Sequence, residues 1–473
     1  MSVTAAKLGQ SPLTFDWSNM LRPGRSPDAA LHSKEGFTKA WDSLKRRFEA
    51  GEVGFYQAPI DNSLSQAQES MALAESLLSQ GIFKDCLFLG IGGSALGPIS
   101  LLSALKHKCT TGLNFHVMEN VDPTDWKYTL SKLQPESTLV VAVTKSGTTF
   151  ETMSQLLLSL EWLGRERWKS HVVAITDPLK GDMKAFAQQQ GMKTLHIGPS
   201  MGGRFSIFTP VGLFPAALAG LNVKEFLLGA SQVRDYIEKT PVEKNPLFIV
   251  SSDMIQNFPK RPIHVCMPYS TQLKQLGSWF VQLWAESLGK DGKGFTPLSA
   301  MGATDQHSIL QLLRDGPDDK VTWFMTVDKV EDEVKIPRLS RIAGDWTVPT
   351  LPAFALLEGH SLGSLLRTEY RATSLVLTKN SRPHFTIQLD TLNERSLGAI
   401  YFAYSVMTAF TGALWNVNPF DQPGVEEAKI YIRESLNSER ASNTDAAIYD
   451  ENSPVARLRR EPSSRPDSDG NYE

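Results

Sequence analysis

Residues Thr138–Met153 read TLVVAVTKSGTTFETM, and the sequence changes character at Thr144. The first part, up to Val143, is an almost unbroken apolar run, which is typical of a parallel strand buried on both faces. The second part, Thr144–Thr149, consists of small, flexible or hydroxylated residues around one lysine. The residues after it predict a helix. The stretch therefore indicates a strand–turn–helix unit of an α/β fold.

Segments with the same strand-like texture recur along the chain, separated by helix-length stretches. They are CLFLGIGG, LNFHVMEN and HVVAITD in the first half, and PLFIVSS, PIHVCMP, VTWFMTVDKV and HFTIQLD in the second half. Strands that alternate with helices predict mainly parallel sheets covered by helices on both faces. We expect two tandem α/β/α domains, at residues 51–225 and 240–415.

The two ends of the chain have a different texture. Residues 1–50 predict an N-terminal arm that contains a helix around Phe37–Phe48. Residues 416–440 predict a C-terminal helix. Residues 441–473 are polar and rich in proline and serine, which predicts a disordered tail.

The composition of the 473 residues argues against several classes of protein. The net charge of -3 and the lack of a basic stripe give no reason to expect a nucleic-acid partner. Cys86, Cys109 and Cys266 are widely spaced and form no metal-binding or redox motif. The N-terminus lacks the apolar core of a secretory signal, and the most apolar segment is too short to span a bilayer. We expect a cytoplasmic protein with no membrane partner.

The turn Thr144–Thr149 is a candidate site for a phosphomonoester. Gly147 permits an unusual backbone angle, and Lys145 adds positive charge. The terminal oxygens of a phosphate accept many short hydrogen bonds, and the turn carries four hydroxyl donors: Thr144, Ser146, Thr148 and Thr149. A Ser/Thr-rich helix start is the alternative, but helix capping explains only about two of these hydroxyls.

A second glycine-rich turn lies in LFLGIGGSALGP, Leu87–Pro98, between a strand and a predicted helix. Three of its residues satisfy the G-x-G-x-x-G/A fingerprint of dinucleotide-binding folds: Gly90, Gly92 and Ala95. Glu119 could then bind the ribose, so a nicotinamide-dependent dehydrogenase is the competing hypothesis. A tight turn without a ligand is a further alternative. The hydroxyl turn favours a phosphomonoester over a dinucleotide. Neighbouring parallel strands direct their following turns into one crevice, so Ser94 is expected to be another donor.

A candidate base lies in the predicted helix Leu276–Lys290, LGSWFVQLWAESLGK, which Gly289 ends. The apolar face of this helix follows i, i+3, i+4, i+7 spacing: Leu276, Trp279, Phe280 and Leu283. Glu286 falls on the same face, where a half-buried carboxylate can shuttle protons. The commoner alternative is a carboxylate at the edge of the stripe, paired with a lysine or an arginine.

Two cationic residues lie in apolar surroundings. Lys429 shares a helical face with Val425, Ala428 and Ile432, so its side chain either extends to solvent or points into a site. Arg204 follows two glycines and precedes an apolar run. A buried arginine is costly unless it is paired or binds an anion.

His307 is a candidate for proton exchange with a hydroxyl group. It is predicted in the first turn of a helix that Thr304 or Asp305 caps. A histidine on the surface or in a helix cap is the commoner alternative.

Six blocks of the sequence, taken in order, resemble the phosphoglucose isomerase family: GIGGSALGP, TKSGTTFET, GGRFSIFTPVGL, ESLGK, GATDQHSILQL and NPFDQPGVEEAK. The resemblance runs from about Leu87 to Lys429. It implies two α/β/α sugar-isomerase (SIS-type) domains, a homodimer with active sites at the subunit interface, and no metal or redox cofactor. The implied reaction is the interconversion of D-glucose 6-phosphate and D-fructose 6-phosphate, a step of glycolysis and gluconeogenesis, by ring opening and a cis-enediol intermediate.

The resemblance also implies a role for each matching residue. Glu286 is the base that moves a proton between C2 and C1, and Arg204 steadies the enediolate. Lys429 and His307 open the sugar ring, and His307 comes from the second subunit of the dimer. The other matches bind substrate: Gly93, Ser94, Thr144, Lys145, Ser146 and Thr149 at the phosphate, and Gln422 elsewhere on the sugar.

Three positions depart from the usual motifs of the family. Thr144 stands in place of a serine, Leu288 in place of an asparagine, and Ala303 removes a hydroxyl. These departures leave the sugar selectivity open, including action on mannose 6-phosphate. A non-catalytic sugar-phosphate sensor is a further alternative, but such a protein would not need the four predicted catalytic residues together.

Overall fold

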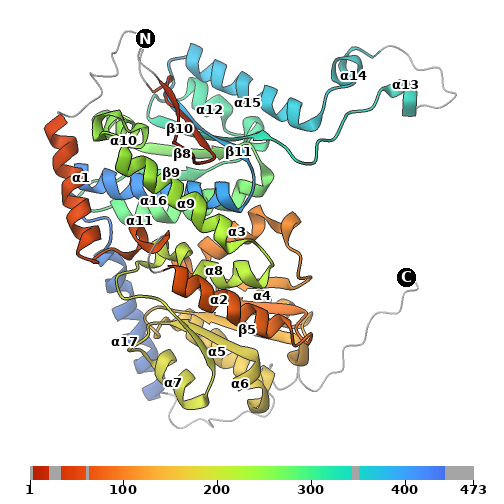
Figure 1. Cartoon of the computed structure of the whole chain (residues 1–473), viewed down its shortest axis with the longest axis vertical. Helices are drawn as coiled ribbons and strands as arrows, with labels where there is room; N and C mark the ends of the chain where they lie inside the picture. The colour runs from red at the N-terminus through yellow and green to blue at the C-terminus, as the bar shows by residue number, and fades with distance from the viewer. Residues whose placement is uncertain (1–3, 21–33, 60–62, 343–350, 443–473) are drawn as a thin grey trace.

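The computed structural model describes residues 4–20, 34–59, 63–342 and 351–442. Within them the strands form two sheets, one above the other in Figure 1, with helices between and around them. The predicted α/β fold with mainly parallel sheets is therefore confirmed. The predicted disordered tail lies outside the described residues, apart from the last two residues of the final helix.

The first sheet has the strand order β4-β3-β5-β6-β7, and all its strands are parallel. Its strands are β3 (Asp85–Leu89), β4 (Asn114–Met118), β5 (Thr138–Val143), β6 (Val172–Thr176) and β7 (Lys193–His196). Every residue of β5 is buried, as its continuous apolar run predicts. Its helices are α2 (Ser63–Leu78), α3 (Leu96–Ala104), α4 (Pro123–Leu130), α5 (Phe150–Leu163), α6 (Trp168–His171), α7 (Asp182–Gln190) and α8 (Pro210–Leu218).

The second sheet has the order β1-β2-β11-β10-β8-β9. Its parallel strands are β8 (Ile263–Pro268), β9 (Thr296–Ser299), β10 (Lys320–Lys329) and β11 (His384–Thr391). The N-terminal segment adds β1 (Ala5–Lys7) and β2 (Leu13–Asp16), and β2 pairs antiparallel with β11. The order β9-β8-β10-β11 repeats the order β4-β3-β5-β6 of the first sheet, so each sheet has a switch point where a crevice opens at the carboxyl ends of the strands.

A continuous hydrophobic core joins the facing sides of the two sheets, since Phe88 and Val141 belong to the same cluster of buried side chains as Trp323 and Phe385. The long helix α16 (Glu394–Trp415) runs through this core and packs against α9 (Val223–Lys239), which connects the two predicted domains. Helix α16 is long and apolar enough to span a membrane by length and composition, but most of it is buried inside the protein. The central helix of a globular protein has the same properties.

The remaining helices accompany the second sheet or the chain ends: α1 (Lys34–Glu49), α10 (Pro246–Asn257), α11 (Lys274–Leu288), α12 (Leu310–Asp315), α13 (Leu339–Ile342), α14 (Pro352–Leu357), α15 (Leu362–Lys379) and α17 (Glu426–Ser442). The helices predicted around Phe37–Phe48 and in Leu276–Lys290 are confirmed by α1 and α11. The strand predicted in PLFIVSS is wrong, because these residues form α10. Asn245 caps this helix and Pro246 opens it. Almost all of α10 is buried, so its apolar run shows no helical period.

Candidate active site

The four hydroxyl groups of the turn Thr144–Thr149 lie together at the carboxyl end of β5. Thr144 Oγ1 is 2.8 Å from Thr149 Oγ1 and 3.4 Å from Ser146 Oγ. Ser146 Oγ also accepts hydrogen bonds from the backbone N–H and the hydroxyl of Thr148, both at 3.2 Å. Thr149 is the N-cap residue of α5, but its side chain makes no capping bond. The hydroxyls therefore contact one another, and that of Thr149 does not cap the helix.

The glycine turn after β3 is a direct neighbour of the hydroxyl turn, because β3 and β5 pair along their length up to Leu89 and Ala142. The short 3-10 helix η4 (Gly92–Ser94) forms this turn and leads into α3. A Cβ atom on Gly93 would lie 2.2 Å from the carbonyl carbon of Gly203. The absence of a side chain at Gly93 thus lets two backbone segments touch.

The segment that touches Gly93 positions Arg204 at the start of the 3-10 helix η8 (Gly203–Phe208). The Arg204 side chain is almost completely buried. Its Nε donates to Ser287 Oγ at 2.7 Å, and its Nη2 donates to the carbonyls of Pro419 and Asp421 at 2.7 and 3.0 Å. Its Nη1 contacts Gln422 Oε1 at 3.1 Å and Glu286 Oε1 at 3.0 Å. All five N–H donors of a guanidinium therefore have partners.

Glu286 lies near the end of α11 with a side chain that is 23% exposed. The sequence left two roles open for this residue, a base on an apolar face or a partner of a cation, and the structure combines them. Its Oε1 pairs with Arg204, and its Oε2 accepts a hydrogen bond from Gln282 Nε2 at 3.0 Å. Burial lowers the pKa of Arg204, and the neighbouring carboxylates of Glu286 and Asp421 oppose this effect.

Gln282 belongs to the site but was not predicted. It precedes Glu286 by four residues on α11, so both side chains lie on one face of the helix. A Cβ atom on Gly92 would be 3.0 Å from Gln282 Nε2, so this amide lies between Glu286 and the glycine turn. The i, i+4 spacing from Glu286 is a signal in the sequence that could have indicated Gln282.

The loop before α17 encloses Arg204. Gln422 is held on Nη1 of the guanidinium, as described above, and Lys290 fixes the other end of the loop. Its Nζ donates to the carbonyls of Ser287 and Asn418, both at 2.8 Å, and lies 3.4 Å from Asp421 Oδ1. Burial lowers the pKa of Lys290, and the adjacent charge of Arg204 acts in the same direction. The end of α11 and this loop thus form one unit around Arg204.

Lys145 does not direct its ammonium group toward the hydroxyls. Its Nζ donates to the carbonyl of Pro199 at 2.7 Å and to that of Met201 at 2.8 Å. A cavity of about 300 Å³ adjoins this side of the turn, and its lining includes Lys145, Gly203 and Gln422. The ammonium is therefore engaged by backbone carbonyls at the edge of the site.

His307 lies away from Glu286 within one chain. It is the last residue of the single-turn 3-10 helix η11 (Thr304–His307), whose N-cap residue is Ala303, so the prediction that Thr304 or Asp305 caps the helix is wrong. Asp305 caps no helix, because its carboxylate accepts hydrogen bonds from Met301 N and Ser308 Oγ. Gln306 is held at the carboxyl end of β8 by Tyr269 Oη, at 2.8 Å.

Helix α11 starts near that same end of β8, since Gly277 packs against Ser299 at the carboxyl end of the neighbouring strand β9. Glu286 is nine residues further along the helix, or about 13 Å at 1.5 Å per residue. The side chain of His307 is exposed.

Lys429 is also exposed. Its Nζ is 2.7 Å from Glu426 Oε1 in the first turn of α17. The apolar residues on its helical face, Val425 and Ile432, are 44% and 42% exposed. The predicted apolar face of this helix is thus uncovered in the single chain.

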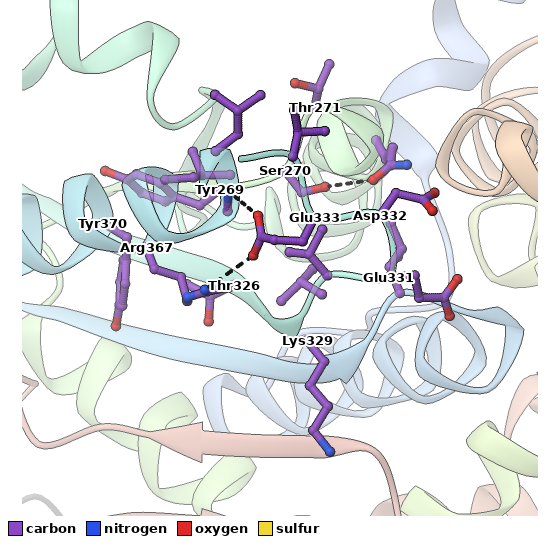
Figure 2. A pocket seen from close by; sticks show the side chains of 18 of the residues that line it. Tyr269, Ser270, Thr271, Thr326, Lys329, Glu331, Asp332, Glu333, Arg367 and Tyr370 are labelled. Carbon is purple, nitrogen blue, oxygen red and sulfur yellow. Dashed lines mark hydrogen bonds and ion pairs between the residues drawn. The ribbon is translucent and has the colours of Figure 1, made fainter. Parts of the chain in front are cut away.

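The cavity shown in Figure 2 lies elsewhere, at the switch point between β8 and β10 of the second sheet. It has a volume of about 350 Å³ and contains none of the predicted site residues. Its wall combines hydroxyl side chains such as Ser270, Thr271 and Thr326 with the acidic run Glu331–Glu333, and Glu333 pairs with Arg367 at 3.6 Å. The geometry of the predicted residues, rather than the size of a cavity, therefore locates the candidate active site.

Comparison with known proteins identifies the family of the chain. The family model of phosphoglucose isomerase matches residues 76–454. The chain belongs to the phosphoglucose isomerase family. The resemblance described from the sequence blocks is thereby confirmed, as is the isomerase class of enzyme. The family's reaction interconverts glucose 6-phosphate and fructose 6-phosphate, so the dehydrogenase alternative is set aside.

Individual relatives cover most of the chain. The glucose-6-phosphate isomerase of Rubrobacter xylanophilus is 41% identical over 433 residues, which are 88% of this chain and 96% of that protein. The glucose-6-phosphate isomerase of Thermus thermophilus is 38% identical over 361 residues, covering 75% of this chain and 84% of that protein.

Two solved structures share the fold of this phosphoglucose isomerase family member. A hypothetical protein from Thermus thermophilus superposes with a TM-score of 0.80 at 34% identity, over 90% of this chain and 99% of the other. A glucose-6-phosphate isomerase from Chlamydia trachomatis gives a TM-score of 0.76 at 22% identity, over 96% of this chain and 92% of the other. The second likeness concerns the fold alone.

Proposed function

We propose that Glu286 is the base that interconverts glucose 6-phosphate and fructose 6-phosphate in the site described above. The observation that carries this proposal is the contact chain from Glu286 through Gln282 and Arg204 to the glycine turn after β3, the strand that pairs with β5 and its hydroxyl turn. We therefore expect a phosphate on the hydroxyl turn and the carboxylate of Glu286 to face the two ends of one bound sugar. A six-carbon sugar phosphate has its reacting carbons at the end opposite the phosphate.

The phosphate-binding part consists of hydroxyls and backbone. Thr144, Ser146 and Thr149 exchange their mutual hydrogen bonds for bonds to the phosphate oxygens. Ser94 adds a further hydroxyl, and the turn at Gly93 offers its backbone to the same group. Because the phosphate does not change during the reaction, these contacts act equally on the substrate and the transition state. They are expected to lower KM more than they raise kcat.

The proton-transfer part is the pair of Glu286 and Arg204. Glu286 takes the proton from C2 of the open aldose, which leaves a cis-enediolate. The hydroxyl proton passes from O2 to O1, and Glu286 returns its proton to C1, so that the C2 carbonyl of the ketose forms. Arg204 is fixed by its five partners, so its charge faces the developing enediolate without a rearrangement of the side chain. Gln422 is held on the same guanidinium and lines the adjoining cavity.

The ring-opening part requires a second copy of the chain. We place Lys429 and His307 in this step, with His307 supplied across the interface of a homodimer. The position of His307 at the far end of α11 from Glu286 supports this arrangement, because a single chain does not bring the two together. The uncovered apolar residues of α17 offer surface for such an assembly.

A cytoplasmic location fits the three cysteines. Cys86 and Cys266 are buried, Cys109 is half-buried, and all three are free thiols. Free thiols are typical of a reducing compartment. Fractionation of the native cells would test this location.

The test of the proposed function is a coupled assay that supplies fructose 6-phosphate and measures glucose 6-phosphate. Wild-type protein should turn over, and Glu286→Gln should lose on the order of 10²–10⁴-fold in kcat because the amide accepts no proton. The variant should still bind the sugar phosphate, which a thermal-shift titration measures. Near-normal turnover by Glu286→Gln would contradict the role of this residue, and an inactive wild type would contradict the function. Mannose 6-phosphate in the same assay would show whether the second aldose is accepted.

A further inference from the structure

The side chain of Lys145 connects two segments of the candidate active site. Its Nζ donates to the carbonyls of Pro199 and Met201, at 2.7 and 2.8 Å. Its own backbone is anchored separately, since the Lys145 carbonyl accepts a hydrogen bond from Asp177 N at 3.3 Å. The lysine thus connects two segments. One is the hydroxyl turn, which is hydrogen-bonded to the residue that follows β6, and the other is a segment that follows β7.

That segment leads directly to Arg204. Residues 199–201 precede Gly202 and Gly203, and Gly203 touches the glycine turn at Gly93. The carbonyl of Ser200 accepts a hydrogen bond from Gly54 N at 3.1 Å. The two glycines before Arg204 have no side chains to hold them in place. The contacts of the preceding residues therefore set where this stretch of backbone runs.

We propose that Lys145 is a positioning residue that holds the hydroxyl turn at a fixed distance from the Pro199–Arg204 segment, and that its ammonium group does not bind the phosphate. The proposal rests on the proposed function, because it concerns how the phosphate site is aligned with Glu286. The phosphate is bound by hydroxyls and backbone N–H groups of the turn. The lysine holds the backbone before Arg204 at a fixed distance from that turn. Because Arg204 pairs with Glu286, the position of Glu286 relative to the turn is fixed as well.

The environment of Lys145 agrees with a structural task. Two of its three N–H donors are used by carbonyls, and contact with a phosphate would require these charge-assisted bonds to break. Burial lowers the pKa of Lys145, the carboxylate of Asp177 opposes this effect, and Lys180 adds to it. A strongly hydrated phosphate-binding lysine would instead extend freely toward the anion.

The experiment compares Lys145→Met with Ser146→Ala, a matched change in the same turn that removes a proposed phosphate donor. Steady-state kinetics would give kcat and KM, and inorganic phosphate would serve as a competitive inhibitor that reports on the phosphate site alone. Lys145→Met should lower kcat by about tenfold or more, because small displacements of catalytic groups are costly. Its inhibition constant for phosphate should stay within about threefold of wild type, as expected for a retained anion site. Ser146→Ala should show the opposite pattern, with a weaker phosphate constant and a nearly normal kcat.

Each other result has a defined meaning. A weaker phosphate constant with normal kcat in Lys145→Met would identify the ammonium as a phosphate ligand and overturn the proposal, as would wild-type values of both constants. If Lys145→Met does not fold, Lys145→Gln replaces it. This variant keeps one N–H donor for a carbonyl and removes the charge, so it should retain phosphate inhibition with an intermediate kcat. Loss of phosphate inhibition in Lys145→Gln would overturn the proposal. A wild-type protein without isomerase activity would instead contradict the proposed function.

Discussion

At the scale of single residues, the candidate functional side chains are polar groups whose hydrogen bonds connect them to one another rather than to the hydrophobic core or to helix ends. Arg204 is buried yet all its donors converge on the residues around Glu286, and the hydroxyls of the turn after β5 contact one another rather than the helix end. A different kind of buried polar residue is His264, which lies in strand β8 and is completely buried. Its two ring nitrogens have no hydrogen-bond partner among the described residues.

His264 makes the stability of the protein sensitive to acid. Burial lowers the pKa of His264 to about 3, whereas an unfolded histidine has a pKa near 6.5. Between these values the unfolded chain binds a proton that the folded chain excludes, so stability is complete above about pH 6.5 and falls as the pH falls. At pH 5.5 the loss is about 1.4 kcal/mol of unfolding free energy.

The measurement is urea unfolding of wild type and His264→Phe at pH 8 and pH 5.5. Phenylalanine suits the site because the imidazole stacks on Phe295 with ring centroids 4.0 Å apart. Other titrating groups are common to both proteins, so the difference isolates His264. Equal pH dependence of the two proteins would contradict this account.

At the scale of elements, the site depends on the close approach of η4 and η8, which only glycine permits. Gly93→Ala would place a methyl group 2.2 Å from the Gly203 carbonyl carbon and 2.5 Å from Arg204 N. The two segments would have to separate, so we expect kcat to fall on the order of 10²-fold and stability to fall by about 1–3 kcal/mol.

Gly198→Ala is the control for Gly93→Ala, because a Cβ atom at Gly198 meets no heavy atom within 4 Å. Kinetics and thermal unfolding of both variants would check the expectation. A fully active Gly93→Ala would show that the contact between the two turns does not position Arg204.

At the scale of the whole molecule, the open question is whether one chain completes the site. Glu286 lies near the carboxyl end of α11, whereas Gln306, the neighbour of His307 in the chain, is held at the carboxyl end of β8, and we propose that a second copy supplies the histidine. In a mixed dimer of Glu286→Gln and His307→Ala, one of the two sites would combine the intact glutamate with the intact histidine. Two inactive variants should therefore recover activity when they are co-refolded.

Random pairing makes about half of the dimers mixed, each with one intact site of two, so about a quarter of wild-type activity is expected when sites are independent. The coupled assay before and after co-refolding measures this recovery. Each variant refolded alone is the control. No recovery, although size-exclusion chromatography shows mixed dimers, would place both residues of a site in one chain.

Several features were predicted from the sequence because their signals are local. Apolar runs before glycine or hydroxyl turns indicated parallel strands such as β3 and β5, and the i, i+3, i+4 spacing indicated α11. The strand predicted in PLFIVSS was wrong because a helix buried on all sides shows no period. Gln282 was missed because its role depends on its two neighbours, Glu286 and the glycine turn.

The sequence by itself determined the class of fold and the family, and it supplied the candidate residues for the chemistry, since each is expressed in short blocks of adjacent residues. Only the tertiary structure decided what those residues do to one another. It joined Glu286 to Arg204, turned the ammonium of Lys145 toward backbone carbonyls, and held Gln306, next to His307, at the carboxyl end of β8. The physical reason is that hydrogen bonds and ion pairs depend on distances between segments far apart in the chain, which no local pattern encodes.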